Sequence, residues 1–235
     1  MTVLYRAQGL LIAGRLEPTD LRLKSGELAI LVGPNGAGKT SLLRAAAGIE
    51  GDAEDIVLAG TPLRKVSPAR RSRLLAFAGA SRDVRWPLRA RDYVALGLTS
   101  RSDHDRIERA LKRFSAEKFG SRRIDRLSTG ERSRVMLARA IVAEPNVILL
   151  DEPCSNLDPY WQVGVVECLR DYVRSGKTAL ISVHDLDLAL AHADRLIVMD
   201  RGRIVSDAPP ADAGTEALIG DVFSVARNAS GWNRI

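Results

Sequence analysis

Hydrophobic and polar positions follow two different periods along this chain. Short apolar runs between turn residues predict strands, and segments with apolar residues at three- and four-residue spacing predict helices. The predicted strands are Val3–Ile12, Asp20–Leu23, Leu28–Val32, Asp55–Ala59, Leu74–Ala78, Val147–Leu150, Thr178–Val183, Leu196–Met199 and Ile204–Val205. The predicted helices are Lys39–Ala47, one that starts at Ser67-Pro68, Gly130–Ala143, Tyr160–Arg174 and Leu186–Ala193.

The order of these elements indicates the fold class. From Gly130 onward helices alternate with strands, which predicts an α/β fold with a mostly parallel central sheet and helices on both faces. The segment 80–126 interrupts this alternation with helical stretches near Ala90–Gly97 and Asp103–Phe114. We therefore expect a single domain over 1–235, with an inserted helical subdomain at approximately 81–143 and a C-terminal segment at 207–235.

The composition is that of a globular protein. Of the 235 residues, 46% are hydrophobic and 27% are charged, which excludes wholesale disorder. No apolar run approaches the ~18 residues that a membrane span requires, and no cleavable signal peptide is visible, so we expect a soluble, cytosolic chain. Cys154 and Cys168 provide neither a disulfide framework nor the spacing of a metal site.

The excess of positive charge is local. The chain has a net charge of +6, and residues 80–126 hold 13 Arg and Lys against 7 Asp and Glu, so the rest of the chain is balanced. A basic sector of this kind could bind nucleic acid, anionic lipid headgroups or an acidic partner, or it could be a solvated helical surface. Charge alone does not decide between these alternatives.

A phosphate-binding loop follows the third predicted strand. The segment 33–40 fits the pattern G-x-x-x-x-G-K-[ST], and it lies between an apolar strand and a helix, as that motif requires. Backbone N–H groups of such a loop surround phosphate oxygens, the lysine reaches the β- and γ-phosphates, and the hydroxyl ligates Mg²⁺. The predicted phosphate-binding residues are Gly33, Pro34, Asn35, Gly36, Ala37, Gly38, Lys39, Thr40 and Ser41, with Thr40 also a metal ligand.

An acidic pair ends the predicted strand Val147–Leu150. Parallel strands deliver their carboxyl ends to one edge of the sheet, so Asp151 and Glu152 are expected beside the phosphate loop. Asp151 would hold Mg²⁺, and Glu152 would act as the general base that activates the attacking water. These residues indicate a nucleoside triphosphatase. Because no Asn-Lys-x-Asp guanine-reading motif is present, ATP is favoured over GTP.

Three further motifs indicate a family. Leu127-Ser-Thr-Gly-Glu131 precedes an Arg-rich helix, Ser155-Asn-Leu-Asp158 follows the acidic pair, and His184 follows an apolar strand. Taken with the phosphate loop and the acidic strand, their order and spacing resemble those of ABC-type ATPases over the whole chain. Ser128 and Glu131 also have the spacing of a capping box at a helix start, and the two roles are compatible.

The resemblance implies a fold and a set of roles. The fold would be a P-loop NTPase with a mostly parallel central sheet, an N-terminal antiparallel β-subdomain and an inserted helical subdomain. Two such chains would pair head to tail as a homodimer, so that ATP on one phosphate loop meets the signature motif of the other chain. The signature residues acting in trans would be Leu127, Ser128, Thr129, Gly130 and Glu131; Asp158 would lie in the D-loop, and His184 would contact the γ-phosphate beside Glu152 as a second catalytic residue.

Two weaker cues resemble one subgroup of that family. The opening from Arg15 to Glu27 and the tail 217–225 with Gly231-Trp232 are similar to ATP-binding subunits of metal-chelate importers, which handle vitamin B12, haem or ferric siderophores. The resemblance implies integral-membrane permease partners and, indirectly, a periplasmic or extracellular solute-binding protein, and no nucleic acid partner. It also implies a peripheral location at the cytoplasmic face of the inner (plasma) membrane.

Three features depart from the family pattern. Family members stack an aromatic residue on adenine, but the corresponding stretch here is near Ala13-Gly14, and Tyr5 lies too early. Thr129 and Glu131 replace the Gly and Gln of the usual signature.

The third departure is a missing glutamine after the strand at residues 75–78. Ala80 stands at that place, and Ser81 and Asp83 are the candidate substitutes.

The leading hypothesis is an energy-coupling ATPase subunit of a membrane importer. The alternatives are a soluble ABC-type ATPase without transport, an exporter subunit, and a degenerate nucleotide-binding regulator that does not hydrolyse ATP. The missing glutamine favours the regulator. The intact Lys39, Asp151, Glu152 and His184 argue against it more strongly.

Overall fold

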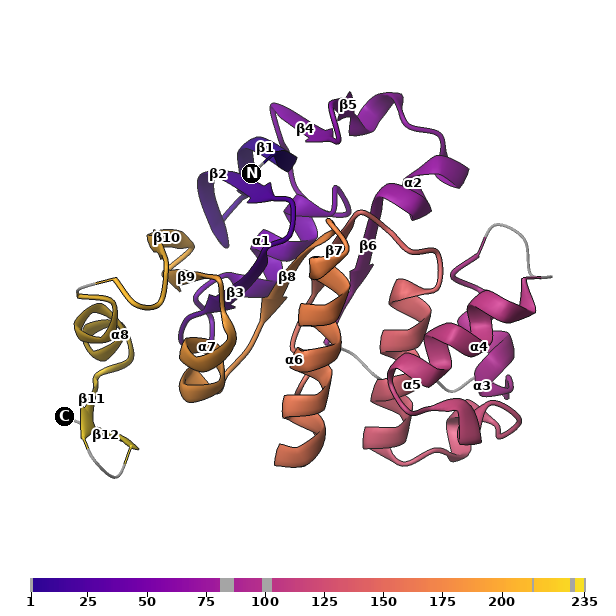
Figure 1. Ribbon diagram of the computed structural model, residues 1–235. Helices are drawn as coiled ribbons and strands as arrows, with labels where there is room; N and C mark the ends of the chain where they lie inside the picture. Colours follow the sequence, from indigo (N-terminus) through magenta and orange to yellow (C-terminus); the bar gives the residue numbers. More distant parts are fainter. Residues whose placement is uncertain (1, 81–86, 99–102, 213, 229–230, 235) are drawn as a thin grey trace.

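The structure is a computed structural model, and it describes residues 2–80, 87–98, 103–212, 214–228 and 231–234. Its centre is a six-stranded sheet of order β10-β9-β3-β8-β7-β6, in which β10 is antiparallel and the other strands are parallel (Figure 1). The strands are β3 (Leu28–Val32), β6 (Leu75–Ala78), β7 (Val147–Leu150), β8 (Thr178–Ser182), β9 (Arg195–Asp200) and β10 (Arg203–Ala208). The predicted α/β fold class is therefore confirmed.

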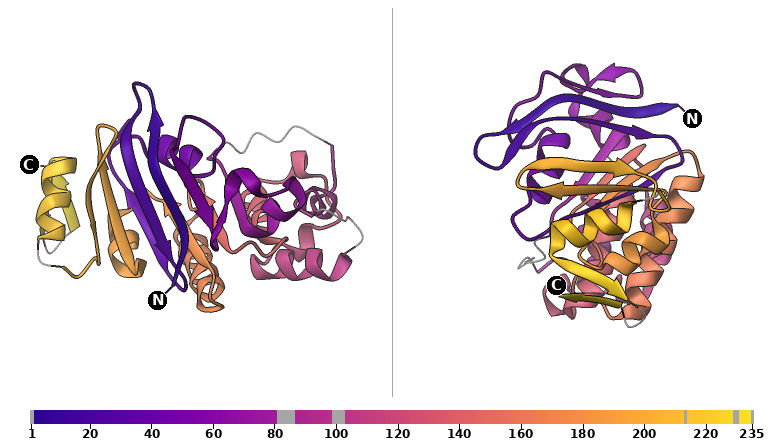
Figure 2. Two further views of the ribbon diagram at one scale, coloured as in Figure 1. Left: turned by 90° about the horizontal axis from the view of Figure 1, so that it is seen from above. Right: turned by 90° about the vertical axis from the view of Figure 1, so that its left-hand side faces the viewer.

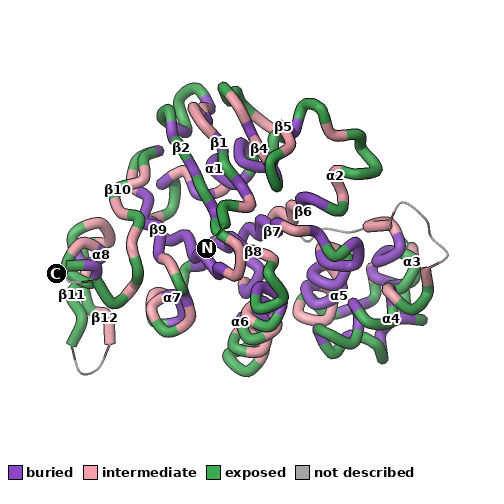
Figure 3. The backbone as a smooth tube through the Cα atoms, turned by 45° about the horizontal axis from the view of Figure 1, so that its top comes forward, coloured by how far each residue is buried: buried purple, intermediate pink, exposed green. Residues whose placement is uncertain are grey.

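Two hydrophobic cores lie on opposite faces of this sheet. Because side chains alternate across a strand, Leu28, Ile30 and Val32 pack into one core and Ala29 and Leu31 into the other. Every residue of β3, β7 and β8 is buried, which explains why β3 and β7 are apolar throughout and why β8 is apolar between Thr178 and Ser182. Figure 3 shows buried residues along the central strands and on parts of the surrounding helices, with exposed residues in the outer helices and turns.

The N-terminal region forms a separate four-stranded antiparallel sheet of order β2-β1-β4-β5. Its strands are β1 (Val3–Ile12), β2 (Leu16–Lys24), β4 (Asp55–Leu58) and β5 (Thr61–Pro62), and β1 packs on helix α1 (Lys39–Ala46). The predicted strand Asp20–Leu23 is too short. Leu16 and Thr19 are also buried and pair with Ile12 and Leu10 of β1 across a register irregularity, so the strand begins at Leu16.

A group of helices lies at one end of the molecule, opposite the C-terminal helix (Figure 2). It contains α3 (Ala90–Ala95), α4 (His104–Arg113) and α5 (Thr129–Ile141), which contact one another, and the short 3-10 turns η2 (Glu117–Phe119) and η3 (Ile124–Arg126). The turn η1 (Leu63–Lys65) and helix α2 (Pro68–Leu74) precede it, so α2 begins after Ser67 as predicted. We propose 81–143 as the extent of this helical subdomain.

The remaining helices follow the later strands. These are α6 (Pro159–Arg174), α7 (Leu186–His192) and α8 (Thr215–Phe223), and a final hairpin pairs β11 (Val225–Asn228) with β12 (Gly231–Arg234). The sequence predicted α6 and α7 but assigned no element to the tail. Arg227 of the hairpin pairs with Asp187 of α7 and Glu216 of α8, which attaches the tail to the body of the fold. We propose 207–235 as this C-terminal segment.

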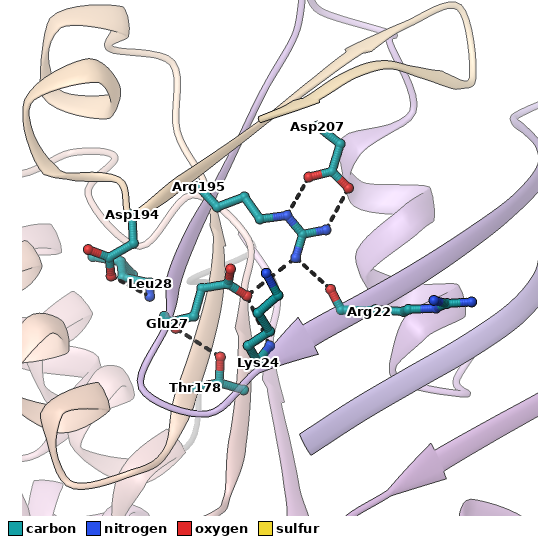
Figure 4. Close-up of polar contacts among 8 residues, drawn as sticks. All are labelled: Arg22, Lys24, Glu27, Leu28, Thr178, Asp194, Arg195 and Asp207. Atoms are coloured by element: carbon teal, nitrogen blue, oxygen red, sulfur yellow. Dashed lines mark hydrogen bonds and ion pairs between the residues drawn. The ribbon is translucent and has the colours of Figure 1, made fainter. Parts of the chain in front are cut away.

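An arginine on β9 joins the two sheets (Figure 4). The Arg195 guanidinium donates to both carboxylate oxygens of Asp207 on β10 and to Arg22 O of β2, the latter at 2.6 Å. It also contacts Glu27 Oε2 at 3.3 Å, and Glu27 in turn accepts from Lys24 N. The Arg195 and Glu27 side chains are only 15% and 8% exposed, so this network is largely shielded from water.

Replacing Arg195 should destabilise the fold. Arg195→Ala leaves the nearly buried Glu27 carboxylate without its cation, so we expect a loss of about 3 kcal/mol in the free energy of unfolding, measured by urea denaturation. The control is Arg174→Ala, which removes an arginine that is 74% exposed and pairs with the exposed Asp171. The free energy of unfolding of Arg174→Ala should fall by less than about 0.5 kcal/mol. Equal losses of unfolding free energy for the two variants would contradict the stabilising role of Arg195.

Candidate active site

The phosphate-binding loop runs from the end of β3 into α1 and is packed tightly against the end of β9, the turn that follows β9, and the turn between β1 and β2. A Cβ atom on Gly33 would lie 2.4 Å from the Met199 carbonyl oxygen, and one on Gly38, at φ +101°, would lie 2.9 Å from Arg15 O. Only glycine fits both positions. The turn residue Gly202 also donates its N–H to Ala37 O. The loop is therefore held in shape by its neighbours.

Lys39, the first residue of α1, is buried and only 6% exposed. Its ammonium group donates to Gly33 O at 2.7 Å and to Pro34 O at 3.1 Å. Burial lowers the Lys39 pKa below its ordinary value, while the charges of Glu152 and Asp151 act in the opposite direction. Lys39, the predicted phosphate-binding lysine, is therefore close enough to Asp151 and Glu152 to interact with their charges.

Asp151 lies directly after β7 and is 3% exposed. Its Oδ2 accepts a hydrogen bond of 2.8 Å from the Thr40 hydroxyl, which places the two predicted metal ligands in contact. A carboxylate beside a hydroxyl supplies the oxygen donors that Mg²⁺ prefers, and Mg²⁺ takes its remaining ligands from water and substrate phosphates. These residues fit a magnesium site.

Glu152 and His184 meet across the ends of β7 and β8. Glu152 Oε1 lies 2.7 Å from His184 Nε2, and both side chains are partly exposed. The Glu152 backbone has φ +51°, a left-handed conformation that residues with a side chain rarely adopt. Strain of this kind persists where the surrounding structure fixes it, and it is frequent at functional sites.

Ser182 connects the two acids, and the sequence analysis did not identify it. Its buried hydroxyl donates to Asp151 Oδ1 at 2.7 Å and accepts from Glu152 N at 2.8 Å. One side chain therefore orients the carboxylate of Asp151 and stabilises the left-handed backbone of Glu152. The available sequence signal was a hydroxyl residue at the last position of an otherwise mostly apolar, buried strand.

The motif 127–131 forms the N-terminus of α5. Ser128 and Glu131 form a complete capping box, with Ser128 N 2.9 Å from Glu131 Oε2 and Glu131 N 3.3 Å from Ser128 Oγ. Glu131 also pairs with Arg122 at 3.0 Å. Leu127 is buried, while Thr129 begins the helix. A Cβ on Gly130 would lie 3.5 Å from Leu157, so this end of α5 is close to the predicted D-loop.

Asp158 also has a local structural role. It is the N-cap of α6, and its Oδ1 accepts from Trp161 N at 3.0 Å.

A cavity of about 620 Å³ opens at the phosphate loop. Its lining includes Glu152 and, from the loop and α1, Asn35, Gly36, Ala37, Gly38, Lys39, Thr40 and Ser41. None of residues 127–131 is among the described residues that line it. Helix α5 also lies apart from α1 in Figures 1 and 3. Within one chain, the structure brings together the predicted phosphate, metal and base residues but not the predicted signature.

The departures from the family pattern occupy distinct places. Tyr5 is fully buried, and its hydroxyl donates to Ala46 O at 2.8 Å, so it belongs to the core under α1. Ala80 follows β6, whose last residue, Ala78, accepts from Asp151 N at 2.8 Å. The candidate substitutes Ser81 and Asp83 lie outside the described residues.

Comparisons with known proteins show which family the chain resembles. The family profile of the ABC transporter matches residues 16–155. The chain is 36% identical to the hemin import ATP-binding protein HmuV of Nocardia farcinica, covering 94% of this chain and 83% of that protein. It is also 36% identical to the cobalamin import ATP-binding protein BtuD of Halobacterium salinarum, covering 88% of this chain and 54% of that protein.

Solved structures show the same fold. One is cbiO1 of Clostridium perfringens, part of the ABC transporter complex cbiONQ, with a TM-score of 0.78 and 24% identity over 93% of each chain. Another is the dimeric post-hydrolysis state of the ATP-binding cassette MJ0796 bound to ADP and Pi, with a TM-score of 0.76 and 22% identity, covering 88% of this chain and 99% of that one.

Removing the Ser182 hydroxyl should slow hydrolysis of ATP without weakening its binding. Ser182→Ala deprives both acids of a hydrogen-bond partner, so we expect kcat to fall roughly tenfold to a hundredfold while ATP affinity changes little. Ser182→Thr retains the hydroxyl and should restore kcat. The measurements are steady-state phosphate release and ATP binding.

The matched control for Ser182 lies at the other end of β8. Thr178→Val removes one buried hydrogen bond, from Thr178 Oγ1 to Glu27 O at 2.8 Å, and should lower stability without changing kcat. If Thr178→Val lowers kcat as much as Ser182→Ala, the role of Ser182 is merely structural.

Proposed function

The chain belongs to the ABC transporter family, and on that basis we propose that it is the ATP-binding and ATP-hydrolysing subunit that powers a membrane importer for a metal chelate or corrinoid. The observation that supports ATP hydrolysis is the Glu152–His184 contact of 2.7 Å, because Glu152 lines the same cavity as Lys39. The names of the relatives, which import hemin and cobalamin, support the choice of cargo class.

Each group of site residues would have its own role in ATP hydrolysis. Backbone N–H groups of the loop and the Lys39 ammonium would bind the β- and γ-phosphates. Thr40 and Asp151 would hold Mg²⁺, which supplies positive charge beside the phosphate oxygens. Glu152 would accept a proton from the water that attacks the γ-phosphorus, and ADP would leave with the electrons of the broken P–O bond. His184 would hold the Glu152 carboxylate in position through the observed contact.

The position of the signature motif supports a composite site. Ser128 and Gly130 do not line the cavity of their own chain, while the N-terminus of α5 presents the end of a helix where anions bind. We therefore propose a homodimer in which each Ser128 meets ATP bound by the other chain. The part of the chain that the structure describes contains no helix with both the length and the hydropathy of a membrane span. We propose that permease subunits hold the chain at the cytoplasmic face of the membrane and that a solute-binding protein delivers the cargo.

Glu152→Gln should retain ATP binding and abolish turnover. The amide cannot accept the proton of the attacking water, so we expect phosphate release to fall by roughly 10²–10⁴-fold while ATP still binds. In cells that carry only this variant, uptake of radiolabelled hemin and cobalamin should be lost. The control is Glu167→Gln, which makes the same change on the exposed side of α6.

Two outcomes would contradict the proposal for Glu152. Hydrolysis near the wild-type rate would place the base elsewhere. Loss of hydrolysis with normal uptake of both cargoes would show that the chain does not power import of either.

The composite site predicts recovery of activity on mixing two inactive variants. Lys39→Ala removes the ammonium group that would bind the phosphates of ATP. Ser128→Asp keeps an oxygen that can cap α5 but places a negative charge where the γ-phosphate of the partner would lie. In a mixed dimer one site carries both changes and the other carries neither, so ATPase activity should reappear. Absence of recovery at any ratio, with mixed dimers demonstrated by mass spectrometry, would contradict the arrangement in trans.

A further inference from the structure

A second cavity lies where α6 meets α5 and the end of α4. Its volume of about 560 Å³ is in the range of small-molecule sites, and none of its described lining residues lines the cavity at the phosphate loop. Its wall contains Arg134 of α5, the turn after α4, and residues of α6 between Tyr160 and Asp171. Figure 1 shows α6 beside the group of helices that contains α4 and α5. The proposed ATPase function assigns no role to this cavity.

Arg134 is a buried cation that lacks a carboxylate partner among the described residues. It is only 5% exposed, and its buried Nε has no hydrogen-bond partner. Its Nη1 donates to Ser115 O at 3.1 Å, and its guanidinium carbon lies 3.7 Å from the centre of the Trp161 ring. Because Ser115 and Trp161 both line the cavity, these contacts place the Arg134 guanidinium at the cavity wall.

Burying a cation is costly unless an anion compensates its charge. Burial lowers the pKa of Arg134, while the charges of Glu131, Asp158 and Glu117 act in the opposite direction. Glu131 forms its ion pair with Arg122 instead, and Asp158 caps α6. A negatively charged group from outside the chain would therefore meet an uncompensated cation at the cavity wall.

Gly164 leaves space open in the same cavity. It lies inside α6, where glycine is less favourable than alanine, and its φ is not in the left-handed region. Outside its chain neighbours and the backbone of its own helix, an added Cβ would meet only the Trp161 ring, at an ordinary contact of 3.9 Å. The packing of the described residues therefore does not require glycine here, and a larger side chain would enter the cavity that Gly164 lines.

The part of the wall that belongs to α6 is aromatic at its start and acidic further along. Tyr160 is 77% exposed, and its ring meets the Trp161 ring edge to face, with 5.2 Å between the ring centres. Glu167 and Asp171 lie further along α6 at exposed positions, and Asp171 is already paired with an arginine at 2.8 Å. An anionic group is therefore favoured beside Arg134, and a planar apolar group is favoured beside the two rings.

We propose that this cavity binds a small aromatic carboxylate, with the carboxylate against Arg134 and the aromatic ring beside Tyr160 and Trp161. A carboxylate supplies both the charge and the hydrogen-bond acceptors that the guanidinium lacks. A bare inorganic anion such as phosphate would leave the aromatic part of the wall uncovered. The proposal does not depend on the proposed ATPase function, so either can fail without the other.

The test compares a carboxylate with its neutral amide. Binding of 2-naphthoate and of 2-naphthamide, which have nearly the same shape, is measured by calorimetry on the full chain without nucleotide. The wild type should bind 2-naphthoate roughly tenfold to a hundredfold more tightly, because only the carboxylate forms a charged pair with Arg134. Arg134→Met keeps a long apolar side chain against Trp161 and should bind the two ligands equally.

Gly164→Leu tests the cavity without changing Arg134. Its side chain should fill the space and abolish binding of both ligands, while loss of a glycine inside a helix should not lower the melting temperature. The matched control Gly164→Ala adds only a Cβ, for which there is room, and should bind 2-naphthoate as the wild type does. Arg174→Met, which removes an exposed arginine of the same helix, should also bind as the wild type does.

Four results would overturn the proposal. The first is absence of 2-naphthoate binding by the wild type up to millimolar concentration, or equal affinity for the acid and the amide. The second is unchanged binding by Gly164→Leu, which would show an adventitious additive only. The third is a preference for 2-naphthoate that persists in Arg134→Met. The fourth is loss of ATP-dependent pairing in Gly164→Leu without ligand binding by the wild type, which would make the cavity a contact between chains. If Arg134→Met does not fold, the wild-type preference and the two Gly164 variants still decide.

Discussion

The parallel register of three buried strands is the constraint on which the site depends. Leu31 of β3 pairs with Ser182 of β8, and Leu150 of β7 pairs with Ile181 of β8. These pairings bring the ends of the three strands to one edge of the sheet. The phosphate loop, the acidic pair and the histidine each follow one of these ends, so their proximity results from strand pairing alone. A one-residue slip would turn the side chains to the opposite face and separate them.

The same constraint explains which parts of the site could be predicted from sequence. Lys39, Thr40, Asp151, Glu152 and His184 each follow an apolar run or a glycine-rich loop, and parallel strands bring such positions together. Their association was therefore predictable without knowledge of side-chain geometry.

Other features were not predictable because they depend on tertiary contacts. Ser182 acquires its role only through atoms of a neighbouring strand. Helix α8 and the final hairpin are held by packing and by the ion pairs of Arg227, rather than by a strong local pattern. The first residues of β2 do not alternate in burial, and they belong to the strand because Leu16 and Thr19 pair with β1 across a register irregularity.

At Glu152 the demands of stability and of activity conflict, because the left-handed backbone favours glycine and the proposed chemistry requires a carboxylate. Glycine adopts φ +51° without the penalty that a side chain incurs, whereas the proposed role of general base requires an acidic side chain at this position. Selection for thermal tolerance and selection for turnover would therefore act on this codon in opposite directions. A laboratory library enriched by heat alone should lose the carboxylate, so thermostable variants of this protein would have to be chosen by a screen that also requires hydrolysis.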